Sequence, residues 1–277
     1  MFIRRVAWFM SIRLNRREKF ITKFLAYFPF LVNLLDYSKK IVLFSPHDKD
    51  YWVLHRIFNK NQNIAILDIG ANIGQSSVGF RKLFPFASIH AIEANPDLAK
   101  SLVKLKRDGT IDDITIAFVG SSVGQKIMFY APRLRGYLFS TFASFDINSL
   151  KVNLRSIYSN RIYQRFTFQK YQSDLITLDS LDLSSINFVK IDVEGYELSV
   201  LEGATALINK YAPVIFLEIN SEILFKSIWH FSSSYRYRMF AVKNRQLEEI
   251  SFDQFPLQKS RNFLLINLKF NPISQHH

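Results

Sequence analysis

Apolar residues occur in short runs separated by amphipathic stretches, a pattern that predicts alternating strands and helices from residue 64 onward. The expected strands are residues 64–70, 88–95, 113–120, 186–195 and 212–220, followed by a final pair, expected to form a hairpin, at 238–244 and 261–268. The expected helices are residues 74–84, 96–109 and 196–211. Strands that alternate with helices in this way are typical of a mostly parallel sheet covered by helices on both faces.

A different pattern interrupts this alternation over residues 124–172, which contain eight Lys or Arg residues, one acidic residue (Asp146) and many aromatic residues. Apolar and polar positions alternate at 126–132 and 164–171, which predicts an inserted β-rich flap. The flap has three interpretations: an aromatic packing surface with a solvated basic face, a lid over an acidic or sugar-like ligand, or a nucleic-acid surface. No nucleic-acid-binding motif supports the third interpretation.

Residues 1–60 are expected to form a basic, amphipathic helical extension ahead of a domain over residues 61–277. The pattern lacks the long apolar core and cleavage site of a signal peptide. The apolar run at 24–37 is too short to cross a bilayer and contains Pro29. Residues 1–40 are then either a helical cap on the domain or an anchor on an anionic membrane surface.

Composition narrows the choice of partner and compartment only partly. The chain has 277 residues, of which 48% are hydrophobic, so a substantial core is expected. Its net charge of +13 favours an acidic partner, such as a phosphorylated glycan, an anionic membrane or nucleic acid. The absence of cysteine excludes disulfides, thiolate metal sites and cysteine nucleophiles, and it fits a reducing compartment.

The first strand ends at Asp68 and continues into the sequence GANIG at 70–74, a strand-to-helix turn of the kind that holds nucleotide cofactors. A dinucleotide site would have a second glycine where Asn72 stands, because that glycine lets the backbone approach a pyrophosphate. Asn72 therefore favours S-adenosylmethionine over NAD. Asp68 is expected to meet the cofactor ammonium group directly or through water, and Gly70 to leave room for the ligand. Asn72 and Gly74 of the same turn are also assigned to the cofactor-binding set.

Glu93 ends the second strand, on the same expected sheet edge as this turn. A carboxylate at that place can accept hydrogen bonds from both hydroxyls of a ribose, and we expect Glu93 to do so. The alternative is a surface glutamate at a strand end. Asn95 is assigned to the same cofactor-binding set.

The fourth strand carries Lys190 and Asp192 on one side, with Glu194 two residues further on. Buried charges are costly unless they are paired or used, so these residues are either a structural ion pair or catalytic groups. In the functional interpretation, Asp192 lies at the carboxyl-terminal tip of the strand and faces the cleft, with Glu194 just behind it at the start of the following helix. No metal site is expected, although Asp192, Glu218 and Asn220 could instead hold a divalent cation.

Five segments together resemble the FkbM family of S-adenosylmethionine-dependent methyltransferases. They are LDIGANIGQSS (67–77), AIEANP (91–96), LITLDSL (175–181), NFVKIDVEGYELSVLEGA (187–204) and PVIFLEIN (213–220). The resemblance implies the class I methyltransferase fold, a Rossmann-like α/β fold with seven strands and a reversed last hairpin. It also implies O-methylation of a hydroxyl, often on sugars or secondary metabolites, with S-adenosylmethionine as cofactor. For that reaction we predict that Asp192 is the base that accepts the hydroxyl proton, or orients the acceptor, with Glu194 as support and Lys190 tuning Asp192. A non-catalytic S-adenosylmethionine-binding protein, a metal-dependent O-methyltransferase and an NAD oxidoreductase are the alternatives.

The expected acceptor is a small molecule or a glycan, which includes acidic and lipid-linked glycans, whereas nucleic acid is not expected as a partner. The expected location is the cytoplasm, with or without contact of residues 1–40 with the inner face of the membrane.

Overall fold

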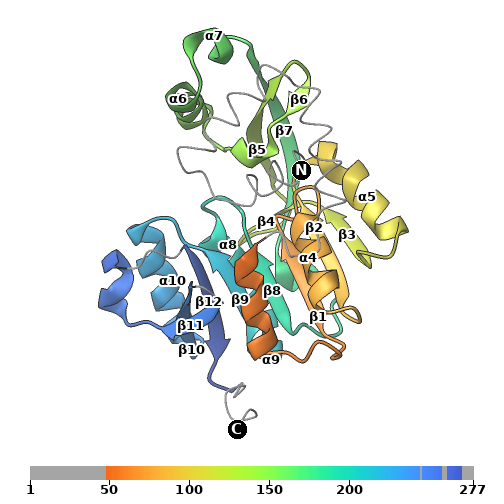
Figure 1. The fold of residues 1–277 in the computed structure, drawn as a ribbon, viewed down its shortest axis with the longest axis vertical. Helices are drawn as coiled ribbons and strands as arrows, with labels where there is room; N and C mark the ends of the chain where they lie inside the picture. Colours follow the sequence, from red (N-terminus) through yellow and green to blue (C-terminus); the bar gives the residue numbers. More distant parts are fainter. Residues whose placement is uncertain (1–47, 244, 258–260, 270–277) are drawn as a thin grey trace, which may run out of the picture. The chain divides into compact units, whose positions relative to one another are not determined.

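A computed structural model describes residues 48–243, 245–257 and 261–269 (Figure 1). The membrane anchor or helical cap expected at residues 1–40 lies outside this range. The described chain divides into a larger unit, residues 48–127 and 173–269, and a smaller unit, Met128–Gln172, which falls within the predicted insertion. No helix among the described residues is long and apolar enough to cross a membrane.

The larger unit is built on one eight-stranded sheet with the order β3-β2-β1-β8-β9-β12-β10-β11. The strands are β1 (Ala65–Ile69), β2 (Ser88–Glu93), β3 (Asp113–Ile116), β8 (Phe188–Ile191), β9 (Val214–Glu218), β10 (Tyr237–Lys243), β11 (Gln246–Glu249) and β12 (Asn262–Asn267). β3, β2, β1, β8 and β9 are parallel, whereas β12 runs antiparallel to both β9 and β10. This confirms the expected Rossmann-like fold with a reversed last pair. The eighth strand, β11, forms an additional hairpin with β10 at the sheet edge.

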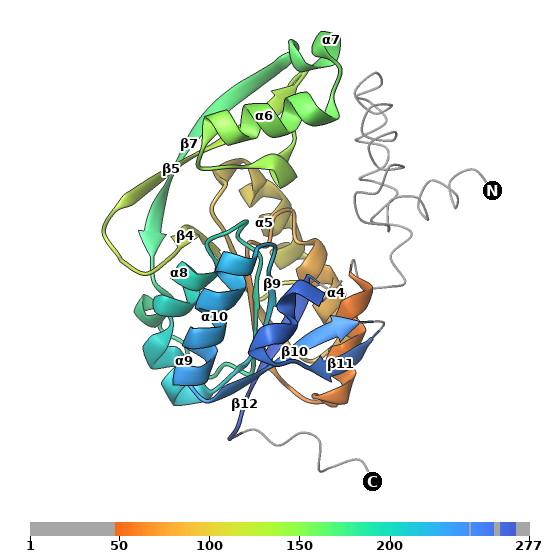
Figure 2. The same cartoon turned by 90° about the vertical axis from the view of Figure 1, so that its left-hand side faces the viewer.

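Alternate residues of the central strands face two separate apolar cores, one on each side of the sheet. Leu67, Val189 and Ile215 pack in the first core, which the helices after β8 and β9 cover, whereas Ile66 and Phe188 pack in the second. Figure 2 shows α8, α9 and α10 on one side of the sheet and α4 on the other. The helices of the larger unit are η1 (Lys49–Arg56), α4 (Gln75–Leu83), η2 (Pro96–Leu98), α5 (Ala99–Arg107), η4 (Leu178–Ser180), α8 (Glu197–Glu202), α9 (Thr205–Tyr211), α10 (Glu222–Ser234) and η5 (Phe252–Leu257).

Residues 48–60, which the sequence groups with the N-terminal extension, belong to the larger unit in the structure. Tyr51, Val53 and Leu54 of η1 are buried in the second core. The Tyr51 ring lies 4.7 Å from that of Phe80 in α4 and 5.1 Å from that of Phe216 in β9, measured between centroids. The 3-10 helix η1 therefore helps to close one face of the sheet.

The helix expected over residues 196–211 is divided into α8 and α9 at Gly203. A Cβ atom at Gly203 would lie 1.9 Å from the carbonyl oxygen of Gly120, so the two glycine backbones approach closely. The expected third strand is also divided, because β3 pairs with β2 while β4 (Phe118–Val119) pairs with β7.

The strand β7 belongs to a second, four-stranded sheet with the order β4-β7-β5-β6. Lys126 contacts Asp174, Phe129 stacks on Tyr171, and Thr167 donates to the Arg133 carbonyl, so β5 and β7 run antiparallel as predicted. The smaller unit also contains helices, which the β-rich prediction did not include. Its elements, with the strands that lead into it, are β5 (Lys126–Leu134), β6 (Tyr137–Leu138), η3 (Ser140–Phe142), α6 (Ile147–Ile157), α7 (Asn160–Tyr163) and β7 (Phe166–Ile176).

Candidate active site

The turn after β1 has a left-handed backbone at three positions, with φ values of 71° at Gly70, 53° at Asn72 and 89° at Gly74. Asparagine tolerates this region better than most residues, so Asn72 can stand where a dinucleotide site has glycine. A Cβ atom at Gly70 would lie 1.9 Å from the carbonyl oxygen of Asp192. Gly70 therefore allows the turn to pass against the end of β8. The room for a ligand that we expect beside Gly70 stays a prediction.

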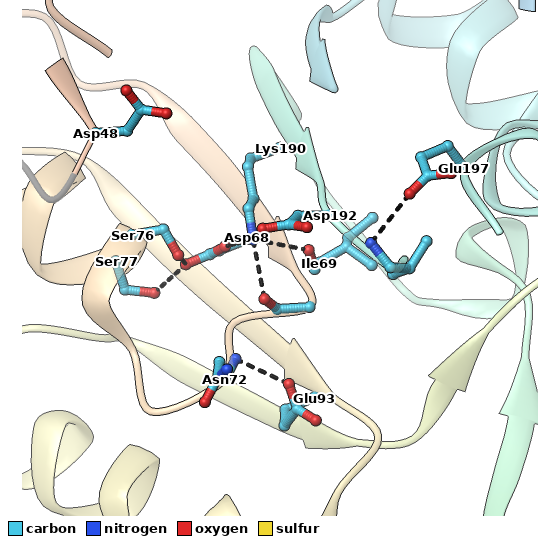
Figure 3. A network of polar contacts seen from close by, with 12 residues as sticks. Asp48, Asp68, Ile69, Asn72, Ser76, Ser77, Glu93, Lys190, Asp192 and Glu197 are labelled. Atoms are coloured by element: carbon cyan, nitrogen blue, oxygen red, sulfur yellow. Dashed lines mark hydrogen bonds and ion pairs between the residues drawn. The ribbon is translucent and has the colours of Figure 1, made fainter. Parts of the chain in front are cut away.

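Asp68 lies at the centre of a buried polar network beneath the turn (Figure 3). Its side chain is fully buried and its Oδ2 accepts hydrogen bonds from the Ser76 and Ser77 hydroxyls, at 2.6 and 2.5 Å. Its Oδ1 lies 3.3 Å from Lys190 Nζ. The carboxylate thus joins β1 to the start of α4 and to β8, and its contact with a cofactor ammonium group stays a prediction.

Lys190 connects this network to the start of the turn and to Asp192. Its Nζ donates to the carbonyl oxygens of Ile69 and Gly70, at 3.2 and 2.9 Å, and lies 3.6 Å from Asp192 Oδ2. Burial disfavours the charged ammonium, but the carboxylates of Asp68 and Asp192 outweigh it and raise the pKa of Lys190. A charged Lys190 therefore fixes the turn against the end of β8.

Glu93 lies at the end of β2 and is tied to the same turn. Its Oε2 accepts from the Asn72 backbone N–H and its Oε1 from that of Asn95, both at 2.8 Å. Burial raises the pKa of Glu93, although these backbone hydrogen bonds oppose the shift. Each carboxylate oxygen can accept a further hydrogen bond, so the geometry leaves Glu93 able to accept ribose hydroxyls.

Asn95 is 3% exposed and begins η2, where its side-chain oxygen accepts from the Asp97 N–H. Its Nδ2 is buried and has no hydrogen-bond partner within the described part of the chain. An unpaired buried donor is costly unless a ligand or water satisfies it. This orphaned amide two residues after Glu93 fits the polar edge of a nucleoside. The turn, Glu93 and Asn95 together thus suit an adenosine cofactor.

Asp192 and Glu194 follow β8 at the carboxyl edge of the sheet. The Asp192 side chain is 47% exposed, in contrast to buried Lys190 and Asp68. Loss of hydration, followed by the charges of Asp192, Glu218 and Glu197, raises the pKa of Glu194 to about 7, although the residue remains exposed at the surface. An exposed acid beside a titrating carboxyl group can accept, orient and pass protons.

Glu197 is a further carboxyl group in this region, which the sequence interpretation did not single out. It is 2% exposed, and its Oε1 accepts from the backbone N–H groups of Gly195 at 3.0 Å and Val193 at 3.4 Å. The signal in the sequence was the second glutamate of VEGYE, which stands two residues after Gly195 at the beginning of the helix α8.

Glu218 is the last residue of β9 and forms a 3.9 Å ion pair with Arg261, and Asn220 follows two residues later. Within residues 48–269, as far as they are described, no three His, Cys, Asp or Glu side chains are grouped to hold a metal ion. The alternative cation site at Asp192, Glu218 and Asn220 gains no support from this geometry.

Comparison with known families identifies the chain. The family model of the methyltransferase FkbM domain matches residues 68–239, which include the β1 turn, Glu93, Lys190 and Asp192. The chain therefore belongs to the FkbM methyltransferase family, as its motifs predict. Methyl transfer is the reaction class of this family, and S-adenosylmethionine is its cofactor, as predicted. A comparison with curated proteins gives no match.

Several solved methyltransferase structures are similar to the chain at low identity. An FkbM methyltransferase from Methylobacillus flagellatus KT is 16% identical, with a TM-score of 0.46, over 75% of this chain and 44% of that chain. A precorrin-6y C5,15-methyltransferase from Geobacter metallireducens GS-15 is 12% identical, with a TM-score of 0.38, over 79% of this chain and 85% of that one. TrmK from M. capricolum, solved with S-adenosyl-homocysteine, is 12% identical, with a TM-score of 0.38, over 79% and 67%. The chain thus spans less than half of the FkbM structure that it matches.

Proposed function

We propose that this FkbM-family protein transfers a methyl group from S-adenosylmethionine to a hydroxyl oxygen of a sugar, a glycan or a secondary metabolite. One observation carries the proposal: Lys190 bridges the cofactor turn, through Asp68 and Gly70, to exposed Asp192. A buried bridge of this kind fixes the distance between a bound cofactor and a base. Such alignment supplies much of the acceleration in a displacement reaction.

Four parts of the larger unit would hold the cofactor. Glu93 would accept the ribose hydroxyls, the Asn95 amide would satisfy a polar atom of the nucleoside, and the 70–74 turn would enclose the amino-acid part. Asp68 would act on the ammonium group only through intervening atoms, because its carboxylate is enclosed by Ser76, Ser77 and Lys190. When bound, S-adenosylmethionine supplies an electrophilic methyl group on a sulfonium.

Asp192 is the proposed proton acceptor. When the acceptor oxygen takes the methyl group that bound S-adenosylmethionine would supply, with the bonding electron pair left on the sulfur, Asp192 would accept the hydroxyl proton. Lys190 Nζ lies 3.6 Å from Asp192 Oδ2 and would hold this carboxylate in position for the transfer. Glu194, whose pKa is raised to about 7, can then pass the proton to solvent.

The composition of the smaller unit supports an anionic acceptor. Its residues 128–172 contain seven Lys or Arg residues and one acidic residue, Asp146. Asp146 is engaged in the N-cap of α6, where it accepts from Asn148 and Ser149. Arg155 and Lys151 lie over the rings of Tyr163 and Phe168, so cationic and aromatic groups alternate on this unit. Cationic and aromatic side chains together suit a sugar bearing phosphate or carboxylate groups. We accordingly propose an acidic or lipid-linked glycan in the cytoplasm as the acceptor.

The test is transfer of labelled methyl from S-adenosylmethionine to a panel of sugar phosphates, nucleotide sugars and extracted surface glycans. We expect S-adenosylhomocysteine to form together with label that survives mild alkali, because methyl ethers resist the hydrolysis that removes methyl esters. Asp192→Asn should bind S-adenosylmethionine with unchanged affinity but lose about 100-fold or more in turnover. The exposed Asp182→Asn change is the matched control. Turnover in Asp192→Asn equal to that of the wild type would exclude Asp192 as the base.

A further inference from the structure

Glu197 is a buried carboxyl group that takes no part in the reaction described above. It stands at the first position of α8, and its side chain turns back toward the loop that carries Asp192 and Glu194 (Figure 3). Its Oε1 accepts two backbone N–H groups, from Gly195 at 3.0 Å and from Val193 at 3.4 Å. These amides precede the helix, so no helical carbonyl pairs with them.

The loop that Glu197 contacts has an uncommon backbone. Glu194 and Gly195 have φ values of 51° and 101°, two consecutive residues with positive φ. Glycine adopts positive φ readily, but glutamate does so only where the surroundings compensate for the strain. Successive backbone N–H groups in such a loop form a concave site for an anion, and here the protein's own Glu197 carboxylate fills it.

Glu197 also acts on Glu194 through charge. Burial is the largest cause of the raised pKa of Glu194; the carboxylates of Asp192, Glu218 and Glu197 raise it further, and the ammonium of Lys190 lowers it. Removal of the Glu197 charge should therefore lower the pKa of Glu194, and this effect is separate from any change in the fold.

We propose that Glu197 is a positioning residue that holds the 192–195 loop in the conformation in which Asp192 and Glu194 face the acceptor. The catalytic meaning of this conformation rests on the proposed function. The contact between Glu197 and the loop amides is a property of the protein itself, and it can be measured without acceptor or cofactor.

Two substitutions separate the hydrogen bonds of Glu197 from its charge. Glu197→Gln keeps an oxygen that can accept from Val193 and Gly195 but removes the charge, whereas Glu197→Ala removes both. We expect amide hydrogen exchange at residues 193–195 to become about tenfold faster or more in Glu197→Ala and to stay within about twofold of wild type in Glu197→Gln. In Glu197→Gln, the carbon-13 titration of the Glu194 carboxyl should show a pKa below that of the wild type.

Three results would overturn the proposal: wild-type exchange at residues 193–195 in Glu197→Ala, equally faster exchange throughout the central strands of both variants, or an unchanged Glu194 titration in Glu197→Gln. If Glu197→Ala does not fold, Glu197→Asp replaces it, because the shorter side chain keeps the charge but withdraws the oxygen from the amides. Calorimetry with S-adenosylmethionine distinguishes the two proposals. Absence of binding in the wild type would contradict the proposed function, while the exchange measurements would still decide the role of Glu197.

Discussion

Lys190 is a charged side chain that is buried in the protein. It is 2% exposed, and it holds together Asp68, the carbonyls of the turn and Asp192. Because the fully buried Asp68 carboxylate depends on this ammonium, the pair has a structural role, and the catalytic role of Lys190 stays a proposal. The two interpretations that the sequence left open for Lys190 are therefore compatible.

Replacement of Lys190 by methionine should leave Asp68 as a buried, uncompensated charge and lower the free energy of unfolding by about 3–5 kcal/mol. The control is Lys106→Met, which breaks an exposed ion pair with Asp113 and should change this free energy by about 1 kcal/mol or less. Urea unfolding of both variants gives the comparison. Similar small losses in the two variants would show that Lys190 does not compensate the Asp68 charge.

Glu194 should make the stability of the protein depend on pH. Its pKa is raised from 4.5 to about 7 in the folded protein, so the folded state binds the proton more tightly than the unfolded state. Its contribution is therefore fully present below the unfolded-state pKa and is lost as the pH rises through about 7. Burial raises the pKa of Glu93 and Glu197 as well, so their contributions have the same sign.

Glu194→Gln mimics the protonated group at every pH and isolates this contribution. The unfolding free energy of the variant, relative to wild type, should increase between about pH 5 and about pH 8. Urea titrations across this interval, with the exposed Glu248→Gln as control, provide the measurement. A difference that stays constant with pH would contradict the raised pKa of Glu194.

Among the secondary-structure elements, the Thr-Leu-Asp sequence at 177–179, part of the LITLDSL segment before β8, has a structural explanation. The Asp179 carboxylate accepts the backbone N–H groups of Ala206 at 2.9 Å and Leu207 at 2.8 Å, in the first turn of α9. Asp179 thus caps α9, which begins 26 residues further along the chain. This cap stabilises the helix that begins after the break at Gly203.

Asp179→Ala should therefore lower the free energy of unfolding by about 1–2 kcal/mol, because two helical N–H groups lose their acceptor. The nearby exposed residue Asp182, replaced by alanine, is the matched control and should have an effect of about 0.5 kcal/mol or less. Thermal unfolding of the two variants measures the difference. Equal stability would exclude Asp179 as the cap of α9.

The elements that the sequence predicts best are those whose pattern is local. The strands around Asp68 and Lys190 are short apolar runs, and periodicity alone locates them. The division of the helix at Gly203 depends on a contact with Gly120, 83 residues away, which no local pattern contains. The helix α6, in contrast, has a local signal, because Asp146 is an N-cap and Leu150 and Leu154 form an apolar face. The prediction missed this helix because the alternating aromatic residues around it favoured strands.

At the scale of the whole molecule, the candidate site combines segments that are far apart in the sequence. Asp68, Glu93 and Lys190 could each be chosen from their place at a strand end, because parallel strands bring their carboxyl ends to one edge. Their contacts could not be predicted in the same way. The packing of Gly70 on the Asp192 carbonyl and the position of Glu197 follow from loop geometry between strands, which periodicity does not encode.

We propose that the β1 turn and Glu93 together bind S-adenosylmethionine at this edge of the sheet. Isothermal titration calorimetry of the wild type, Glu93→Ala and the exposed control Glu248→Ala tests it most directly, with unfolding curves to show that all three are folded. We predict binding by the wild type and the control, and no detectable binding by Glu93→Ala. Equal affinity in Glu93→Ala would contradict the role of Glu93 in binding the cofactor. No binding by the wild type would contradict the proposal that the protein uses S-adenosylmethionine.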